Sequence, residues 1–280
     1  MQRIFVGDVQ GCAEELSELL ARAADRFARD FEVWTVGDLV NRGPDSLGAL
    51  LRIRELDAQG RAHFVLGNHE VALLRCWLGL RAVSPYDSFR DVLDAPDVDA
   101  WMDWLRTRPL VCSGRLGEQR FAMVHAGVHP DWTLEELEHA ARGVEERLRG
   151  PLDELRRFLG GPDAPRDDVL GRLTRCRSVS PDGSWSPEEP SRHERAWHVL
   201  WSERGHDYGV VYGHWAMQGL HVAPGLRGLD TGCVHHGRGR DGALTAWLPD
   251  ARTPRPFDVP DDRFWQIPAR RAYYAHRDAV

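Results

Sequence analysis

Polar side chains that could bind a metal follow five short apolar runs of this sequence. The runs are rich in Val, Ile, Phe or Tyr and end in a polar residue, as in RIFVGD (3–8) and EVWTVGD (32–38). The candidate ligands are Asp8, Gln10, Asp38, Asn68, His125 and His214. A carboxylate just past buried residues must be solvated, paired or bound to a metal. Carboxylate, amide and imidazole groups together suit a borderline divalent ion such as Mn²⁺.

A bridging carboxylate would let this set hold two metal ions. Asp38 is the candidate for the bridge, because it comes from the middle of three consecutive sequence units. Two ions about 3.5–4 Å apart can activate a bridging water and stabilise both oxygens of an in-line phosphoryl displacement. Taken singly, an Asp or Asn after a strand is most often a turn or N-cap residue, and a His there is more often packed than ligating. Five such strand ends in one chain favour the metal-binding interpretation.

The apolar pattern also predicts the elements that position these residues. RIFVGD, EVWTVGD and AHFVLGN (62–68) recur at about the length of a βαβ unit. Helical spacing of apolar residues predicts one helix over 16–27 and another after Asp45. We therefore expect βαβαβ in the first seventy residues, with the ligands at the carboxyl edge of the sheet. RFAMVH (120–125) and YGVVYGH (208–214) are expected to aim at the same edge.

The segments between these strands have a different character. We expect a single domain over 1–280, with helical cap insertions around 76–118 and 131–206. Within the second insertion, 160–206 is rich in Pro, Ser, Asp and Arg and is expected to be a long surface excursion that carries substrate contacts. From Pro249 the chain is polar, and its aromatic residues are expected to pin it to the body.

Composition excludes several classes of function. The formal charge is −7 and every basic side chain is Arg, which argues against non-specific nucleic-acid binding and removes any P-loop or Schiff-base lysine. No apolar run approaches the roughly 18 residues of a membrane span, and no signal segment precedes the first strand, so the cytoplasm is the expected location and no membrane partner is expected. The oligomeric state is not indicated.

The cysteines are odd in number and scattered. They are Cys12, Cys76, Cys112, Cys176 and Cys233. None forms a CxxC pair, so neither a disulfide framework nor a zinc site is expected, and we interpret most of them as buried thiols.

Five ordered blocks resemble a known family. They are GDVQG (7–11), GDLVNRG (37–43), GNHE (67–70), HAG (125–127) and GH (213–214). These blocks resemble the calcineurin-like metallophosphoesterases, in their phosphoprotein-phosphatase branch. GDLVNRGPDSL, VHAGVHPDW, YGHWA and GLDTGCV are similar to the bacterial symmetrical diadenosine tetraphosphatases.

The resemblance implies an α/β fold, a metallophosphoesterase β-sandwich flanked by helices with a small helical cap, and two divalent ions. Mn²⁺ is expected, with Co²⁺ or Mg²⁺ as alternatives. One ion would bind Asp8, position 10 and Asp38. The other would bind Asp38, Asn68, His125 and His214. His69 matches the proton donor.

Arginines of the chain match substrate-binding positions of the family. Arg42 matches a phosphate-binding arginine, and its planar fork suits two phosphate oxygens. Arg175 and Arg177 resemble a family arginine segment, with two solvated surface arginines as the alternative. The substrate would be a dinucleoside polyphosphate, and relatives remove such caps from RNA.

Two positions depart from the family pattern. The first block commonly carries His where this chain has Gln10, which offers a carbonyl oxygen instead of a ring nitrogen. We expect a weaker first metal site, with mere hydrogen bonding by Gln10 as the alternative. Asn41 stands where phosphoprotein phosphatases carry an Asp that raises the pKa of the donor His. Because a departing ADP ends in a phosphate whose second pKa is about 6, Asn41 favours an anhydride substrate.

Three further residues are weaker candidates. Trp132 and Trp185 could stack on adenine, although a Trp is more often a packing residue. Asp230 could orient a metal-ligating His.

The function that these residues favour is symmetrical hydrolysis of diadenosine tetraphosphate to two ADP, by in-line attack of metal-bound hydroxide. The same core could serve a protein serine/threonine phosphatase. It could also serve a nucleotide-binding pseudoenzyme, in which Gln10 marks a decaying metal site, or an enzyme that acts chiefly on RNA caps.

Overall fold

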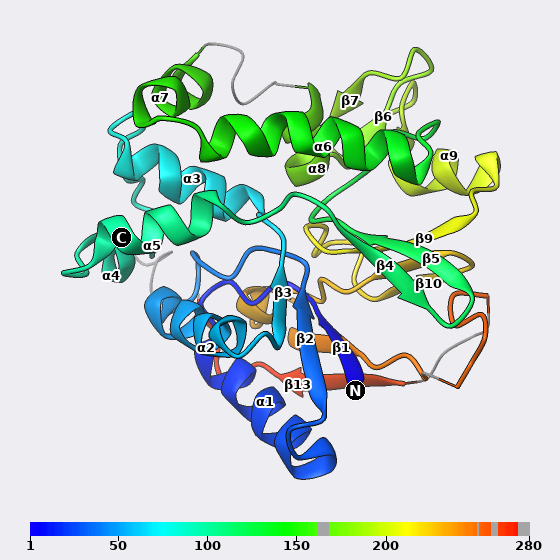
Figure 1. Ribbon diagram of the computed structural model, residues 1–280, viewed down its shortest axis with the longest axis horizontal. Helices are drawn as coiled ribbons and strands as arrows, with labels where there is room; N and C mark the ends of the chain where they lie inside the picture. Colours follow the sequence, from blue (N-terminus) through cyan, green and yellow to red (C-terminus); the bar gives the residue numbers. More distant parts are fainter. Residues whose placement is uncertain (162–167, 251, 259–262, 274–280) are drawn as a thin grey trace.

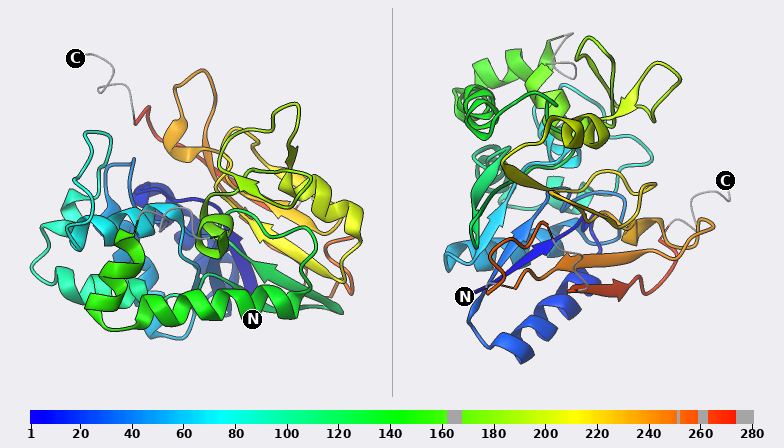
Figure 2. Two further views of the ribbon diagram at one scale, coloured as in Figure 1. Left: turned by 90° about the horizontal axis from the view of Figure 1, so that it is seen from above. Right: turned by 90° about the vertical axis from the view of Figure 1, so that its right-hand side faces the viewer.

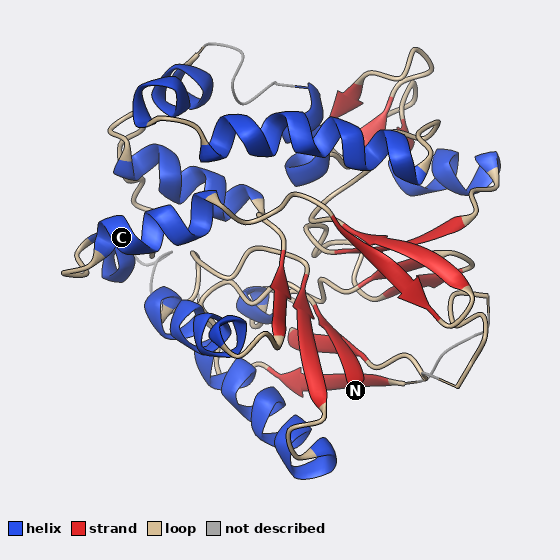
Figure 3. Cartoon of the chain, viewed as in Figure 1, coloured by secondary structure: helices blue, strands red, loops and turns tan. Residues whose placement is uncertain are grey.

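Two five-stranded sheets form the centre of the computed structural model (Figure 1). The structure describes residues 1–161, 168–250, 252–258 and 263–273. Figure 3 shows the helices gathered around the sheets, with α1 and α2 at one end and the long α6 at the other. Among the described residues, no helix is long and apolar enough to cross a membrane.

The first sheet has the strand order β13-β12-β1-β2-β3. Its strands are β1 (Gln2–Val6), β2 (Phe31–Thr35), β3 (Ala62–Phe64), β12 (Ala243–Trp247) and β13 (Phe264–Pro268). The first three run parallel and are joined by α1 (Ala13–Phe27) and α2 (Ser46–Ala58), which confirms the predicted βαβαβ unit. Part of the predicted polar tail is instead the antiparallel edge strand β13.

The second sheet has the order β10-β11-β9-β5-β4. Its strands are β4 (Cys112–Leu116), β5 (Gln119–Met123), β9 (Tyr208–Tyr212), β10 (His221–Ala223) and β11 (Leu226–Gly228). The expectation of one edge for all five ligand-bearing strands is therefore wrong in part, because β5 and β9 pair with each other in a separate sheet. Strand β4 lies inside the range 76–118, which was expected to be a helical insertion. Residues from Cys112 onward therefore belong to the second sheet.

An apolar layer joins the two sheets. Phe5 of β1 lies 5.4 Å, between ring centroids, from Phe121 of β5 and the same distance from Trp247 of β12. Ile4 and Val6 point to the other face, as the two-residue period of a strand requires, and join the larger core beneath the helices. Each such buried side chain contributes roughly 1.5–3 kcal/mol. This sandwich confirms the predicted fold class.

Helices and a small sheet occupy the segments between the core strands. They are α3 (Asn68–Trp77), α4 (Arg90–Leu93), α5 (Val98–Arg106), α6 (Leu134–Arg149), α7 (Leu152–Gly160), α8 (Asp168–Arg175), α9 (Trp197–Arg204) and the sheet of β6 (Ser178–Val179), β7 (Trp185–Ser186) and β8 (Arg195–Ala196). Figure 2 shows α6 running along one side of the molecule. The division of the chain into one domain with two insertions stays a prediction.

The predicted surface excursion over 160–206 is more ordered than expected. Residues 162–167 lie outside the described ranges, but α8, the small sheet and α9 follow them. Leu173, Trp197 and Trp201 of this segment are buried. The segment has few apolar residues, yet three of them are tryptophans. The large side chains of the two buried ones, Trp197 and Trp201, cover enough surface to hold it against the core.

Candidate metal centre

The six predicted ligands lie together at the carboxyl ends of β1, β2, β3, β5 and β9. In order of sequence they are Asp8, Gln10, Asp38, Asn68, His125 and His214. Asp38, His125 and His214 each offer one ligand atom, and these three atoms lie within 4.8 Å of one another. Asp8 accepts the backbone N–H of His214 at 3.1 Å, which joins the first block of the sequence to the last.

The two histidines present lone pairs to the centre of the cluster. His125 Nδ1 donates to the backbone oxygen of Val36 at 2.8 Å, and burial lowers the pKa of His125 to about 4, so Nε2 of the neutral ring carries no proton. That Nε2 faces Asn68 Oδ1 at 3.0 Å and Asp38 Oδ1 at 3.4 Å. In this arrangement unprotonated acceptors face one another, and a bound cation would relieve their repulsion.

His214 repeats this arrangement. Its Nε2 donates to the backbone oxygen of Arg175 at 3.1 Å, which leaves Nδ1 as an acceptor 3.0 Å from Asn68 Oδ1. The Nδ1–H or Nε2–H of a metal-ligating His is commonly held by a backbone carbonyl in this way. The donor set therefore fits divalent metal ions.

Buried carboxylates are crowded together in this cluster. Burial raises the pKa of Asp38 to about 7 and that of Asp230 to about 6, and it raises the pKa of Asp8 well above its usual range. In each case, the cause is that water no longer solvates the ionised form, and for Asp8 and Asp38 the neighbouring carboxylates add to the effect. Bound divalent cations would offset both the lost solvation of the carboxylates and the repulsion between them.

A buried glutamate that the sequence analysis missed holds the central loop in place. Glu70 accepts four backbone N–H groups, those of Gly67, Asp38, Leu39 and Val40, at 2.8 to 3.2 Å. Burial raises the pKa of Glu70 to about 7. Glu70 is the third residue of α3, where a helix-capping glutamate is common, and that local pattern was the available signal.

Unusual backbone conformations concentrate in this centre. Non-glycine residues with positive φ include Gln10 (47°), Asp38 (50°), Asn41 (78°), Arg42 (66°) and His214 (67°). Such conformations cost free energy and persist where surrounding contacts enforce them. Here they turn successive side chains toward one point just beyond the strands.

Two glycines leave room for the carboxylates. A Cβ atom at Gly67 would lie 2.1 Å from Asp38 Oδ1, and a Cβ at Gly213 would lie 2.0 Å from Asp8 Oδ1. No other residue fits at either position without moving a carboxylate.

Asn41 holds His69 in one tautomer. Asn41 Oδ1 accepts the backbone N–H groups of Arg42 and Ser88 at 2.8 and 2.9 Å, so its Nδ2 faces the other way. Nδ2 lies 2.8 Å from His69 Nδ1, which must accept, and the ring proton is therefore on Nε2. Burial, reinforced by the charge of Arg42, holds the pKa of His69 well below its usual range. His69 is thus a neutral hydrogen-bond donor whose Nε2 lies 3.6 Å from Asp38 Oδ2.

Two cavities meet at this centre. The larger, of about 550 Å³, is lined by Gln10, Asp38, Arg42, Asn68, His69, Arg177, His214, Ala216, Met217, Asp230, His235, Arg238, Gly239 and Arg240. The smaller, of about 260 Å³, is lined by Asn41, Arg42, Asn68, His69, Val71, Ala72, Arg75, Arg81, Asp87, Leu159, Leu170, Gly171, Thr174 and Arg175. The two share Arg42, Asn68 and His69.

Arginines line both cavities. The two arginines of the predicted segment separate, Arg177 toward the larger cavity and Arg175 toward the smaller. Burial and the neighbouring Arg177 lower the pKa of Arg175. Four further arginines were missed: Arg75, Arg81, Arg238 and Arg240. They carry no local sequence signal.

Three of the weaker candidates have other contacts. Asp230 lines the larger cavity and accepts the backbone N–H of Gly232 at 3.0 Å, whereas backbone carbonyls orient the two histidines. Trp132 stacks on His129 with ring centroids 5.3 Å apart, and the Trp185 ring lies against Gly171. Neither tryptophan lines the two cavities, so the expected stacking on adenine has no support there.

The Gln10 amide forms a hydrogen bond, as expected in the alternative in which Gln10 does not ligate the metal directly. Its Nε2 donates to Asp38 Oδ2 at 3.3 Å. Direct ligation by Gln10 stays a prediction.

Comparisons with known proteins agree with this geometry. Residues 1–229 match the family described as Calcineurin-like phosphoesterase. A symmetrical bis(5'-nucleosyl)-tetraphosphatase of Ralstonia nicotianae is 39% identical over 257 residues, covering 83% of this chain and 86% of the relative. A protein of the same name from Shewanella oneidensis is 39% identical over 254 residues, covering 83% and 91%.

Solved structures show the same fold. A crystal structure described as a candidate diadenosine tetraphosphatase is 26% identical, with a TM-score of 0.62, and the match covers 96% of this chain and 93% of that one. A protein serine/threonine phosphatase from Saccharomyces cerevisiae is 14% identical, with a TM-score of 0.56 and coverage of 96% and 79%, and that likeness concerns the fold alone.

Proposed function

The chain belongs to the calcineurin-like phosphoesterase family, and on that premise we propose that it is a metal-dependent hydrolase that cleaves diadenosine tetraphosphate symmetrically. Water adds to one of the two inner phosphorus atoms, the central P–O–P bridge breaks, and each half leaves as ADP. Relatives at 39% identity, all named for this reaction, support the assignment.

The observation that carries the proposal is the pair of cavities that meet at Asn68 and His69. A central phosphate bridge must be attacked with two phosphates and a nucleoside extending on each side. A site for a terminal phosphomonoester needs only one such space. Arginines on both sides suit a polyphosphate chain that runs through the junction.

The arginines would bind and orient this chain. Arg42 lines both cavities, so it is placed to contact the central phosphates. Arg177 and Arg175 would hold phosphates on either side. Arg75 also lines the smaller cavity and would add positive charge beside a bound phosphate.

The ligand set would hold two divalent ions, and Asp38 would contribute to the binding of both. When bound, they would neutralise phosphate charge and activate the attacking water. Glu70 would position Asp38 through the backbone of its loop, and the carbonyls of Val36 and Arg175 would orient His125 and His214.

His69 would assist the departure of ADP as a neutral Nε2–H donor. This suits a phosphate leaving group, which is stable as an anion, better than an alkoxide, which must gain a proton. Asn41 therefore disfavours the alternative of a protein serine/threonine phosphatase. The preserved cluster geometry likewise disfavours a nucleotide-binding pseudoenzyme.

Three finer expectations remain predictions. Mn²⁺ is the expected ion, because imidazole and carboxylate ligands both suit it. RNA capped by a dinucleoside tetraphosphate carries the same reacting bond and is expected to be a second substrate. The cytoplasm remains the expected location.

Product analysis tests the proposal. The Mn²⁺-loaded protein is incubated with diadenosine tetraphosphate and, separately, with a phosphoserine peptide, and the products are separated by anion-exchange chromatography. ADP as the only nucleotide product, with little release of phosphate from the peptide, is expected. AMP plus ATP, or turnover of the peptide alone, would overturn the assignment. The same incubation with Asp38→Asn controls for contaminating hydrolases.

A further inference from the structure

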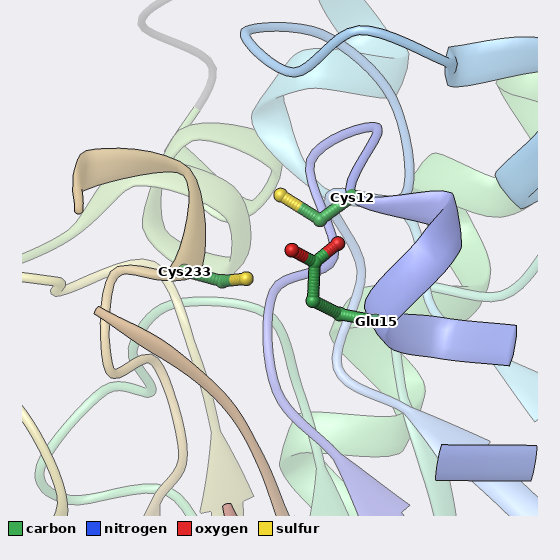
Figure 4. A group of neighbouring side chains, drawn as sticks. All are labelled: Cys12, Glu15 and Cys233. Carbon is green, nitrogen blue, oxygen red and sulfur yellow. The ribbon is translucent and has the colours of Figure 1, made fainter. Parts of the chain in front are cut away.

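A second cluster of buried ligand atoms lies outside the two cavities. Cys12, Glu15 and Cys233 each offer one atom, and these atoms lie within 4.8 Å of one another. The exposed fractions of the three residues are 0%, 0% and 2%. Figure 4 shows the two sulfur atoms and the Glu15 carboxylate as close neighbours. Both cysteines are free and buried, as the sequence analysis expected for most of the cysteines.

The fold brings the three residues together from distant parts of the chain. Cys12 is the N-cap residue of α1, and Glu15 lies one turn into that helix. Cys233 begins the short 3-10 helix η2 (Cys233–His235). Each cysteine follows a glycine with positive φ, Gly11 at 70° and Gly232 at 66°. These glycines turn the chain so that the sulfur atoms face inward.

The helix does not use these side chains for capping. Ser, Thr, Asp and Asn are the usual N-cap residues, and the Cys12 side chain makes no capping hydrogen bond. The Cys12 backbone N–H bonds to Val9 O, at 2.9 Å, instead of to Glu15, the contact that a capping glutamate would make. Both side chains remain directed into the cluster.

One carboxylate oxygen of Glu15 lacks a partner. Glu15 Oε1 accepts the backbone N–H of Arg270 at 2.8 Å and the hydroxyl of Tyr273. Oε2 is buried and has no hydrogen-bond partner among the described residues. Leaving such an oxygen unsatisfied in the folded protein is unfavourable.

Nearby cations are engaged elsewhere. The guanidinium of Arg270 pairs with Glu18 at 2.7 Å, and that of Arg271 pairs with Glu14 at 2.9 Å, both on the exposed side of α1. The positive end of the α1 dipole lies at Cys12, but the hydrogen bond with Cys233 and burial raise the pKa of the Cys12 thiol well above its usual range. The cluster thus offers sulfur and oxygen ligands and has an unfilled oxygen at its centre.

We propose that Cys12, Cys233 and Glu15 bind a Zn²⁺ ion at a structural site separate from the catalytic centre. Two sulfur atoms on one zinc lie at most about 4.6 Å apart, because each Zn–S bond is about 2.3 Å, so the cluster needs only slight contraction. Binding releases the two thiol protons, and no redox step is involved.

The site would clamp two segments that border the larger cavity. Cys12 lies two residues after Gln10, and Cys233 lies three residues after Asp230, and both of those residues line that cavity. Zinc would thereby tie the loop after β1 to the segment after β11. Its main effect would be on stability, and activity would change only indirectly.

Cobalt substitution tests the site. The chain is expressed in medium containing Co²⁺ and is also refolded in the presence of Co²⁺. Wild-type protein should then show the intense near-ultraviolet absorption of thiolate-to-cobalt charge transfer. The catalytic centre has no sulfur ligand, so cobalt bound there contributes only weak visible bands. Cys12→Ser and Cys233→Ser should lose the charge-transfer band, whereas Cys112→Ser, which removes a distant thiol, should keep it.

A further variant keeps the test decisive if the serine variants do not fold. Glu15→Gln keeps both thiols and the contacts of Oε1, and it should weaken cobalt binding at this band at least about tenfold. Wild-type protein that shows the visible bands of the catalytic centre but no charge-transfer band would overturn the proposal and leave the proposed function intact. A Cys12–Cys233 disulfide in the isolated chain, detected by mass spectrometry, would also overturn it.

Discussion

The cluster around Asp38 and the cluster around Cys12 flank the same short segment, yet they differ in access and in ligand type. Asp38 and its neighbours open onto cavities of about 550 and 260 Å³ that are lined with arginine. Cys12 and Glu15 are fully buried and line neither cavity. Oxygen and nitrogen ligands beside open space can act on a phosphate, whereas a closed site with sulfur ligands can only hold the chain together. Both clusters contain ligand atoms, so the difference in their expected roles comes from whether a substrate can reach them.

The same carboxylate-to-amide change in each cluster should separate these roles most strongly. Asp38→Asn removes the charge shared by both metal positions, and kcat/KM for diadenosine tetraphosphate should fall at least about 10³-fold. Glu15→Gln should leave kcat/KM within a few-fold of wild type and instead lower the melting temperature of the zinc-loaded protein. Steady-state kinetics and thermal unfolding of both variants provide the test. A comparable loss of activity in both would contradict the separation.

His69→Gln tests how much protonation the open cluster supplies. Because Asn41 holds His69 as a neutral donor and the leaving group is a phosphate, kcat should fall about 10²-fold, the low end for a general acid. The bound metal content should stay unchanged. A fall of about 10⁴-fold would mean that His69 transfers a full proton, and our interpretation of Asn41 would then be wrong.

Gln10→His should change activity the least of these variants, and it tests whether position 10, between the two clusters, contacts a metal. An imidazole nitrogen at position 10 should bind the first metal more tightly, so the Mn²⁺ concentration that gives half-maximal activity should decrease. Gln10→Ala, which removes the amide together with its hydrogen bond to Asp38, serves as the control. An unchanged Mn²⁺ titration in Gln10→His would show that position 10 does not contact metal.

The candidate site residues that the sequence pattern marked are local in the chain. An apolar run that ends in Gly and a polar residue is a strand followed by a tight turn, and this pattern located Asp8, Asp38 and Asn68. The pairing of Asn41 with His69 came instead from the resemblance of their two sequence blocks to the family, and the structure places Asn41 Nδ2 2.8 Å from His69 Nδ1. The parallel unit of β1, β2 and β3 follows from the same short-range pattern.

Contacts between distant parts of the chain were decided only by the tertiary structure. Strand pairing split the five ligand-bearing strands between two sheets, and it added β12 and β13 to the first. Arg75 lines the smaller cavity and Arg240 the larger one, although the neighbouring sequence of neither arginine indicates a binding role. Cys12 lies beside Cys233 because the fold places the start of α1 next to the start of η2. Side-chain type and local spacing are properties of the sequence, whereas proximity across the fold depends on how all the buried surfaces pack together.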